Sequence, residues 1–397
     1  MRNLRFPQWV HDWWNVLNRE FVRFSGNRVY LFIALAGPLL SFFLVMNIFL
    51  AGNPSDLPLA VVDLDDSQMS RQVIRMIDAT RSVSVSSRPA SLHDGNEAML
   101  KGQVYAVLYI PYDFSKSVLK GEGSELVMYV NNSNVLNGGL IQSAVIKAVS
   151  TYSTGVKLQV AMKGGMAQEQ ALQQVYPLRL DTHELFNPYI NYSYFLSSTL
   201  MPLLITVFTL LGAVYVIGIE LREGTAGEWI KTAGGSMWVA LGGKLAPYTL
   251  LMCVNVAVMH FILVQHLGFP IKGSWAAIMA AELFMILAYQ MVAVFLLAVT
   301  ANTRLSLSLA SGYSMIAFSY SGLTYPIAGM PMLAKIAANI FPYYHWMKVF
   351  LGQSLRNEPL SNASGPFLGL LTFILLGILL FPRLKYLLTE PRFYNRI

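Results

Sequence analysis

The residues most suggestive of chemistry form a compact charged group that directly follows a long uncharged run, in GIELREGTAGEWIKTAGG (residues 218–235). Its charged members are Glu220, Arg222, Glu223, Glu228 and Lys231. Charges of both signs, interrupted by Gly and Thr, suit the recognition of a partner protein by the polar face of a short helix. The alternative is a solvated loop that a tryptophan anchors at the membrane.

Thr225 favours the helix, since it precedes Glu228 by three positions, which is the spacing of a capping box. We therefore expect a short helix to begin after the turn at Gly224. In that helix Trp229 and Ile230 would face the bilayer, while Glu228 and Lys231 would stay in water. The segment that would couple the chain to its partner comprises Glu220, Arg222, Glu223, Gly224, Thr225, Glu228 and Trp229.

A second chemical candidate is Glu282, in the apolar stretch AAIMAAELFMILAYQ. Ionisable groups within membrane spans are expensive and usually functional, so Glu282 is a candidate for a substrate or proton path. Its other interpretation is a carboxylate at the interface or paired with a neighbouring helix. His260 and His266 are six positions apart and do not share a helix face.

Other chemistry is not visible in the sequence. GxxxxGK[ST], GxSxG, a dinucleotide fingerprint and HExxH are all missing, and the single Cys253 cannot form an internal disulfide. The acids Asp63, Asp65 and Asp66 stand between a strand and a helix, where we expect them to form a turn and cap the helix. The segment DTHELF (181–186) has no stronger pattern. We expect no catalytic residue, no metal site and no directly bound cofactor.

The composition is that of a membrane protein. Of 397 residues, 55% are hydrophobic and 12% charged, against roughly 25% charged in soluble domains. The net charge of +7 reflects basic loops rather than nucleic-acid binding. Six apolar runs are long enough to span a bilayer: 29–51, 194–219, 245–267, 275–300, 305–323 and 365–382. Lys and Arg are concentrated in the segments that an N-in, C-in orientation places in the cytoplasm, including the coupling segment 220–244.

The remaining segments complete the predicted organisation. Residues 1–28 form a cytoplasmic amphipathic helix on the membrane surface, in contact with lipids, and residues 52–193 form an α/β domain outside the membrane. That domain alternates strands and helices and ends in one long helix, straight or kinked, over about 135–175. The five-helix region 194–382 includes short re-entrant helices at the outer face, 324–362, and a tail follows at 383–397. The fold class is thus a polytopic α-helical membrane protein with six transmembrane helices and an inserted α/β domain.

Four stretches, in this order, resemble the type-2 ABC exporter permeases of bacteria, in the subset with a large domain between spans one and two. They are LAVVDLDDSQMSRQVIRMID, ELREGTAGEW, SGLTYPIAGMP and FPYYHWMKVFLGQ. In the second stretch, Leu221 stands where the family often has a charged residue.

The resemblance implies a multi-pass subunit of the bacterial inner membrane that exports hydrophobic or amphipathic compounds such as drugs. It implies a second permease copy or paralogue, separate ATP-binding cassette subunits that bind ATP and Mg, and possible periplasmic adaptor and outer-membrane channel partners. The substrate path would lie where two permeases meet, near spans two and five. Candidate lining residues are Glu282, Ser311, Tyr313, Tyr320, Ser321 and Tyr325, although small residues there also suit close helix packing.

Two other classes remain open on the sequence. A transmembrane sensor would use the outer domain to bind a ligand, but the chain has six spans and no cytoplasmic signalling module. A membrane-embedded lipid-modifying enzyme would need a cluster of ionisable groups near an interface, for which only Glu282 and His345 are available.

Overall fold

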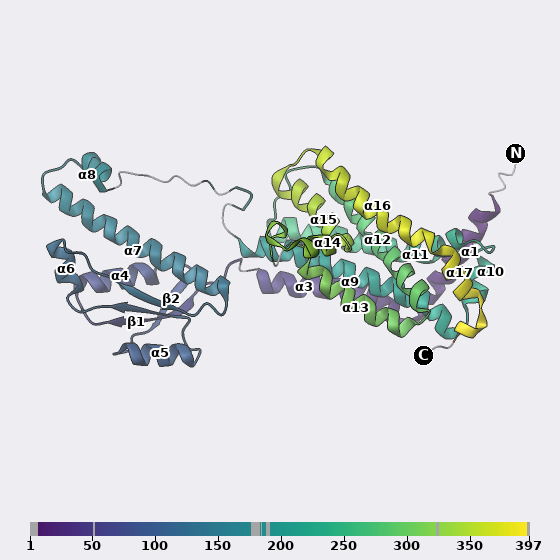
Figure 1. Cartoon of the computed structure of the whole chain (residues 1–397), viewed down its shortest axis with the longest axis horizontal. Helices are drawn as coiled ribbons and strands as arrows, with labels where there is room; N and C mark the ends of the chain where they lie inside the picture. Colours follow the sequence, from purple (N-terminus) through teal and green to yellow (C-terminus); the bar gives the residue numbers. More distant parts are fainter. Residues whose placement is uncertain are drawn as a thin grey trace. The chain divides into compact units, whose positions relative to one another are not determined.

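The computed structural model describes residues 7–50, 52–175, 183, 185–187, 191–322 and 325–394. The chain divides into two compact units, one of Met1–Gly52 with Glu184–Ile397 and the other of Asn53–His183. We call these the helical unit and the α/β unit (Figure 1). Half of the DTHELF segment, namely Asp181, Thr182 and Glu184, lies outside the described residues, and so do Leu323 and Thr324 of the SGLTYPIAGMP stretch.

The α/β unit is built on a four-stranded sheet of order β2-β1-β3-β4. Its strands are β1 (Leu57–Asp63), β2 (Val83–Ser87), β3 (Ala106–Ile110) and β4 (Val127–Val130). β1 pairs in parallel with β2 and β3, whereas β4 is antiparallel to β3. The predicted alternation of strands and helices is thereby confirmed, and the parallel core follows from the intervening helices, which return the chain to the same edge.

Helices cover both faces of this sheet (Figure 1). They are α4 (Gln68–Asp78), α5 (Leu92–Leu100), α6 (Phe114–Lys120) and α7 (Val135–Lys163). Alternate residues of β1 point to opposite faces, as the strand period requires. Leu59 and Val61 pack with α4, α6 and α7, while Ala60 and Val62 pack with α5.

The acids after β1 form the predicted turn. The Asp63 carboxylate accepts hydrogen bonds from the backbone N–H groups of Asp65 and Asp66 and from the Ser70 hydroxyl. Asp65 accepts from the backbone N–H of Ser115. Ser67 caps α4, and its side chain and that of Ser70 form a reciprocal capping box.

The predicted single long helix of the α/β unit is wrong in one respect. α7 ends at Lys163, and a separate helix, α8 (Gln168–Val175), follows it. Gly165 lies between them with φ +89, a left-handed conformation that glycine adopts readily. The Gly164–Gly165 pair therefore breaks the helix rather than kinking it.

The helical unit contains five helices long and apolar enough to cross a membrane, counted over the residues that the structure describes. They are Arg28–Phe49, Tyr192–Glu223, Met237–His266, Trp275–Thr300 and Leu360–Thr389. The remaining predicted run, 305–323, corresponds to α13 (Thr303–Ser319), a helix of 17 residues. This is the architecture of a polytopic helical membrane protein.

These segments comprise several consecutive elements. The helices are α2 (Arg28–Leu31), α3 (Gly37–Phe49), α9 (Tyr192–Glu223), α11 (Met237–Phe261), α12 (Trp275–Thr300), α16 (Ser364–Leu379) and α17 (Phe381–Thr389). α9 packs against α3, α11, α12 and α13. It also has the largest buried share of the five segments, so it is the centre around which the others are arranged.

Shorter helices complete the helical unit. They are α1 (Gln8–Gly26), α10 (Ala226–Thr232), α14 (Met332–Ala338) and α15 (Pro342–Leu351). α1 is amphipathic as predicted: Val16 and Glu20 are buried, whereas Trp9 and Phe21 are exposed. It packs along α11.

Candidate functional site

Glu220, near the end of α9, is the centre of a buried network of charges. Its side chain is fully buried and accepts two hydrogen bonds from the Arg19 guanidinium, at 2.6 and 2.9 Å. Arg23 donates at 2.6 Å and Lys244 at 2.8 Å. The Thr225 hydroxyl adds a fifth hydrogen bond, at 2.5 Å. One carboxylate therefore joins residues of α1, α9 and α11.

Lys244 extends the network to a second buried carboxylate. Its ammonium lies 2.6 Å from Oε2 of Glu20, and the Tyr248 hydroxyl donates to the other Glu20 oxygen at 2.8 Å. The same ammonium sits 4.9 Å from the centre of the Trp229 ring, within the range of a cation–π interaction. Arg23 also pairs with Glu223 at 2.8 Å.

The network is balanced in charge, because three cations face three carboxylates. A buried charge is tolerated only when it is paired and hydrogen-bonded, and each of these groups meets that condition. Burial disfavours a charged Arg19, but its hydrogen bond and charge interaction with Glu220 raise the pKa of Arg19 above its ordinary value. The guanidinium thus stays charged at physiological pH, and α1 is held to the end of α9.

The helix predicted after Gly224 is confirmed as α10 (Ala226–Thr232). Gly224 itself ends α9 with φ +70, which explains the glycine at this turn. The predicted capping box is wrong, since Thr225 precedes α10 without a side-chain capping hydrogen bond. The Thr225 hydroxyl instead donates to Glu220, because a buried carboxylate is the stronger acceptor within its reach.

Trp229 does not face the bilayer, which corrects the second expectation for this segment. Its side chain is fully buried, and its indole N–H donates to the carbonyl of Ala240 at 3.3 Å. Ile230 is buried too, while Glu228 and Lys231 are exposed as predicted. α10 contacts α1, α9, α11 and α17, so its apolar side packs on protein rather than on lipid.

One part of this segment remains available to a partner. The side chains of Arg222, Glu228 and Lys231 are exposed and form no hydrogen bond or ion pair among residues 7–50, 52–175, 183, 185–187, 191–322 and 325–394. Glu223 is half-exposed and forms an ion pair with Arg23. We call residues 220–234 the elbow. Its inner residues are fixed by the buried network, and its outer residues carry unpaired charge of both signs.

Glu282 is not isolated in the structure. It is almost fully buried, and His260 of α11 lies 3.2 Å from its Oε1. The rings of Trp275 and Phe350 flank that histidine. The partner of His260 comes from α12, so the spacing of His260 and His266 along their own helix does not reveal it. The geometry is that of a carboxylate paired with a neighbouring helix.

The other predicted path residues are only partly brought together. Tyr313 and Tyr320 both lie against the ring of Phe341, and the Tyr313 hydroxyl donates to the carbonyl of Ile340 at 2.6 Å. The hydroxyls of Ser311 and Ser321 donate to carbonyls of Leu307 and Phe318 in the same chain segment, and Tyr325 is exposed. None of these contacts involves Glu282. His345, the other ionisable group considered, lies beside the carbonyl of Asn339.

Sequence reasoning did not identify Arg19, Glu20, Arg23, Lys244 and Tyr248 as members of the site. A usable signal was present in Lys244, because a lysine at the start of an apolar run requires a partner. Arg19 and Arg23 are also spaced to share one face of α1. The sequence does not show that Glu220, some 200 positions away, is their common partner.

Comparison with known proteins identifies the family. A family model described as ABC-2 family transporter protein matches residues 28–381. The match includes the elbow, Lys244, the first four long apolar segments and most of the fifth, and it begins after α1. The search of curated proteins returned no match.

Proposed function

Because the chain belongs to the ABC-2 family of transporter proteins, we propose that it is the permease subunit of an ATP-driven exporter of hydrophobic or amphipathic compounds. The family implies that ATP-binding cassette subunits are its partners. In this proposal those subunits bind ATP and Mg, and the permease performs no chemistry itself. The chain is a multi-pass protein of the bacterial membrane, which we assign to the inner membrane.

The proposed topology has six spans, with α13 as the fifth, and both termini in the cytoplasm. The α/β unit then lies in the periplasm and the elbow in the cytoplasm. The concentration of Lys and Arg in the predicted cytoplasmic segments supports this orientation. A second copy or a paralogue would complete the translocation path, and an adaptor and an outer-membrane channel would receive the substrate.

The observation that carries the proposal is the construction of the elbow. A permease needs a rigid element that receives motion from its ATPase and passes it to the spans. α10 is rigid because Trp229 is buried and Glu220 anchors the preceding turn. The exposed surface of the elbow, which carries Arg222, Glu228 and Lys231, is free to contact a partner in the cytoplasm. Movement of α10 would act on α9 directly and on α1 and α11 through Glu220.

Charge reversal on the exposed surface of the elbow tests this assignment. The variant Arg222→Glu/Lys231→Glu is expressed with the partner ATPase and reconstituted. Arg304→Glu is the control, since Arg304 is also exposed and lies at the start of α13, at an end that the proposed topology places on the same side of the membrane. We expect the elbow variant to lose substrate-stimulated ATP hydrolysis and copurification of the ATPase while its unfolding temperature is unchanged.

The control should retain both substrate-stimulated ATP hydrolysis and copurification of the ATPase. Unchanged basal and stimulated ATP hydrolysis in the elbow variant would show that the elbow is not the docking site. Loss of both properties in the control as well would indicate that any charge reversal on this side of the membrane weakens the complex.

A further inference from the structure

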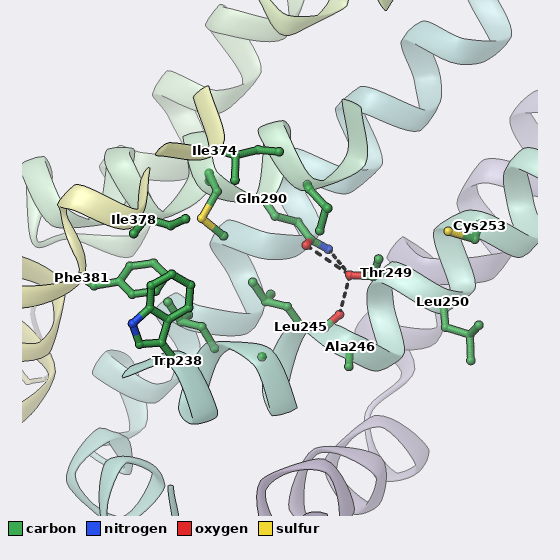
Figure 2. Close-up of a pocket in the computed structure, with 14 residues that line it drawn as sticks. Trp238, Leu245, Ala246, Thr249, Leu250, Cys253, Gln290, Ile374, Ile378 and Phe381 are labelled. Carbon is green, nitrogen blue, oxygen red and sulfur yellow. Dashed lines mark hydrogen bonds between the residues drawn. The ribbon is translucent and has the colours of Figure 1, made fainter. Parts of the chain in front are cut away.

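A long groove runs along the outside of the helical unit between α11, α12 and α16 (Figure 2). Its volume is about 490 Å³, which is in the size range of pockets for small molecules. The wall is almost entirely apolar. The exception is Thr249 and Gln290, whose side chains lie in the groove and are paired: the Gln290 amide N–H donates to the Thr249 hydroxyl at 2.9 Å.

The shape of the groove fits a linear chain. On α11, its lining residues recur every three or four positions along one helix face: Trp238, Leu241, Gly242, Leu245, Ala246, Thr249, Leu250 and Cys253. From Trp238 to Cys253 the helix rises by about 22 Å. One leaflet of the hydrocarbon core is about 15 Å thick. A single acyl chain aligned with the helix would therefore fit within the length of the groove.

An apolar wall alone cannot retain a lipid, because lipid tails are as apolar as the side chains that line it. Retention needs a contact for the head group, and the end of the groove where α11 begins provides one. Trp238 is 62% exposed there and packs against Phe381 at 5.0 Å between ring centres. Lys385, one turn further along α17, is exposed, and its ammonium is 2.6 Å from the carbonyl of Gly235. Tryptophan prefers the head-group level, and a lysine beside a groove between helices suits an anionic head group.

We propose that this groove is a phospholipid site that holds one acyl chain, with an anionic head group at Lys385 and Trp238. The inference does not depend on the ATPase partner or on the substrate. It adds a structural role, because α11 separates the groove from the buried network. Lys244, bonded to Glu20 and Glu220, is two positions from both Gly242 and Ala246 of the groove. A bound acyl chain would pack against α11 at the height of Lys244, and therefore on the face of the helix opposite the buried network.

Photocrosslinking tests the site on the full chain in nanodiscs. The probes are phosphatidylglycerol and phosphatidylcholine with the same diazirine-bearing acyl chain, each diluted into unlabelled phosphatidylcholine. Crosslinked peptides are located by mass spectrometry. We expect phosphatidylglycerol to label residues 241–253 about fivefold more than phosphatidylcholine does, the preference of one lysine for an anionic lipid. Lys385→Gln should remove this preference, and Lys385→Arg should retain it.

A second pair of variants separates the groove from ordinary lipid contact. Ala246→Trp fills the groove and should abolish labelling of residues 241–253 by both lipids. Leu368→Trp, on an exposed part of α16 that does not line the groove, should leave it unchanged. Ala246→Leu serves the same purpose if the tryptophan variant does not fold. Equal labelling by the two lipids in the unaltered chain, or a preference that survives in Lys385→Gln, would overturn the proposal.

Discussion

Neutralising Glu220 should destabilise the helical unit far more than neutralising its neighbour Glu223. In Glu220→Gln, the donors from Arg19, Arg23 and Lys244 face an amide that carries no charge. The network then has a net positive charge around a position that is fully buried. We predict that neutralising the two glutamates, although they are only three positions apart, lowers the free energy of unfolding by different amounts because Glu220 is buried and Glu223 is not.

The expected magnitude follows from burial. Removing one partner of a buried ion pair typically costs about 3–5 kcal/mol, because the other charge is left without compensation. Glu220 and Lys244 are both fully buried, so this range applies to Glu220→Gln. The Glu223 side chain is 44% exposed and has one ion pair, with Arg23. Pairs of that kind contribute no more than about 1 kcal/mol, which sets the expectation for Glu223→Gln.

The assay is equilibrium unfolding in mixed micelles of detergent and SDS, read from the helical circular dichroism signal. Glu220→Gln, Glu223→Gln, Lys244→Met and the double variant Glu220→Gln/Lys244→Met are compared. Removing both partners restores the charge balance, so the double variant should be more stable than the sum of the single losses implies. We expect a coupling free energy of about 1–3 kcal/mol.

Equal losses for Glu220→Gln and Glu223→Gln would refute the argument that burial decides the difference. Additive losses for Glu220→Gln and Lys244→Met would show that the two groups do not act as a pair. Either result would also remove the basis for treating the elbow and α11 as mechanically joined.

The remaining predictions concern stability around the same helices. Thr225→Val should lower the free energy of unfolding by about 1.5–3 kcal/mol, since it removes a hydrogen bond to a charged group. Thr225→Asp should lower it further, because it places a second carboxylate at Glu220. A Thr225→Asp variant as stable as the unaltered chain would favour a capping role for this position instead. Gly218→Ala should destabilise by about 1–3 kcal/mol, because its Cβ would lie 2.5 Å from Cγ2 of Thr303. Gly312→Ala, where a Cβ would meet open space, should be neutral or raise stability by up to about 1 kcal/mol. Unfolding midpoints measured in detergent test both pairs, and a Gly218→Ala variant as stable as Gly312→Ala would contradict the close packing of α9 on α13.

The α/β unit shows how far local pattern can predict structure. The alternation of strands and helices and the turn formed by the acids after β1 are both predictable from the sequence, because strand alternation and helix capping depend on residues close in sequence. The α7–α8 boundary was missed for a related reason. A Gly pair is compatible with either a kink or a break, and the local sequence does not determine which of the two forms.

The elbow shows the complementary case. The sequence by itself determined the membrane class, the apolar segments, the charged group after the second long run and the short helix α10, since composition and periodicity are properties of neighbouring residues. Tertiary structure alone decided that Trp229 is buried in protein, that Glu282 pairs with His260, and that Glu220 gathers Arg19 and Lys244. Those contacts join residues up to 201 positions apart. A buried charge requires some partner, but only the packing of α1, α9 and α11 selects which one, because pairing depends on distance in space and not on spacing along the chain.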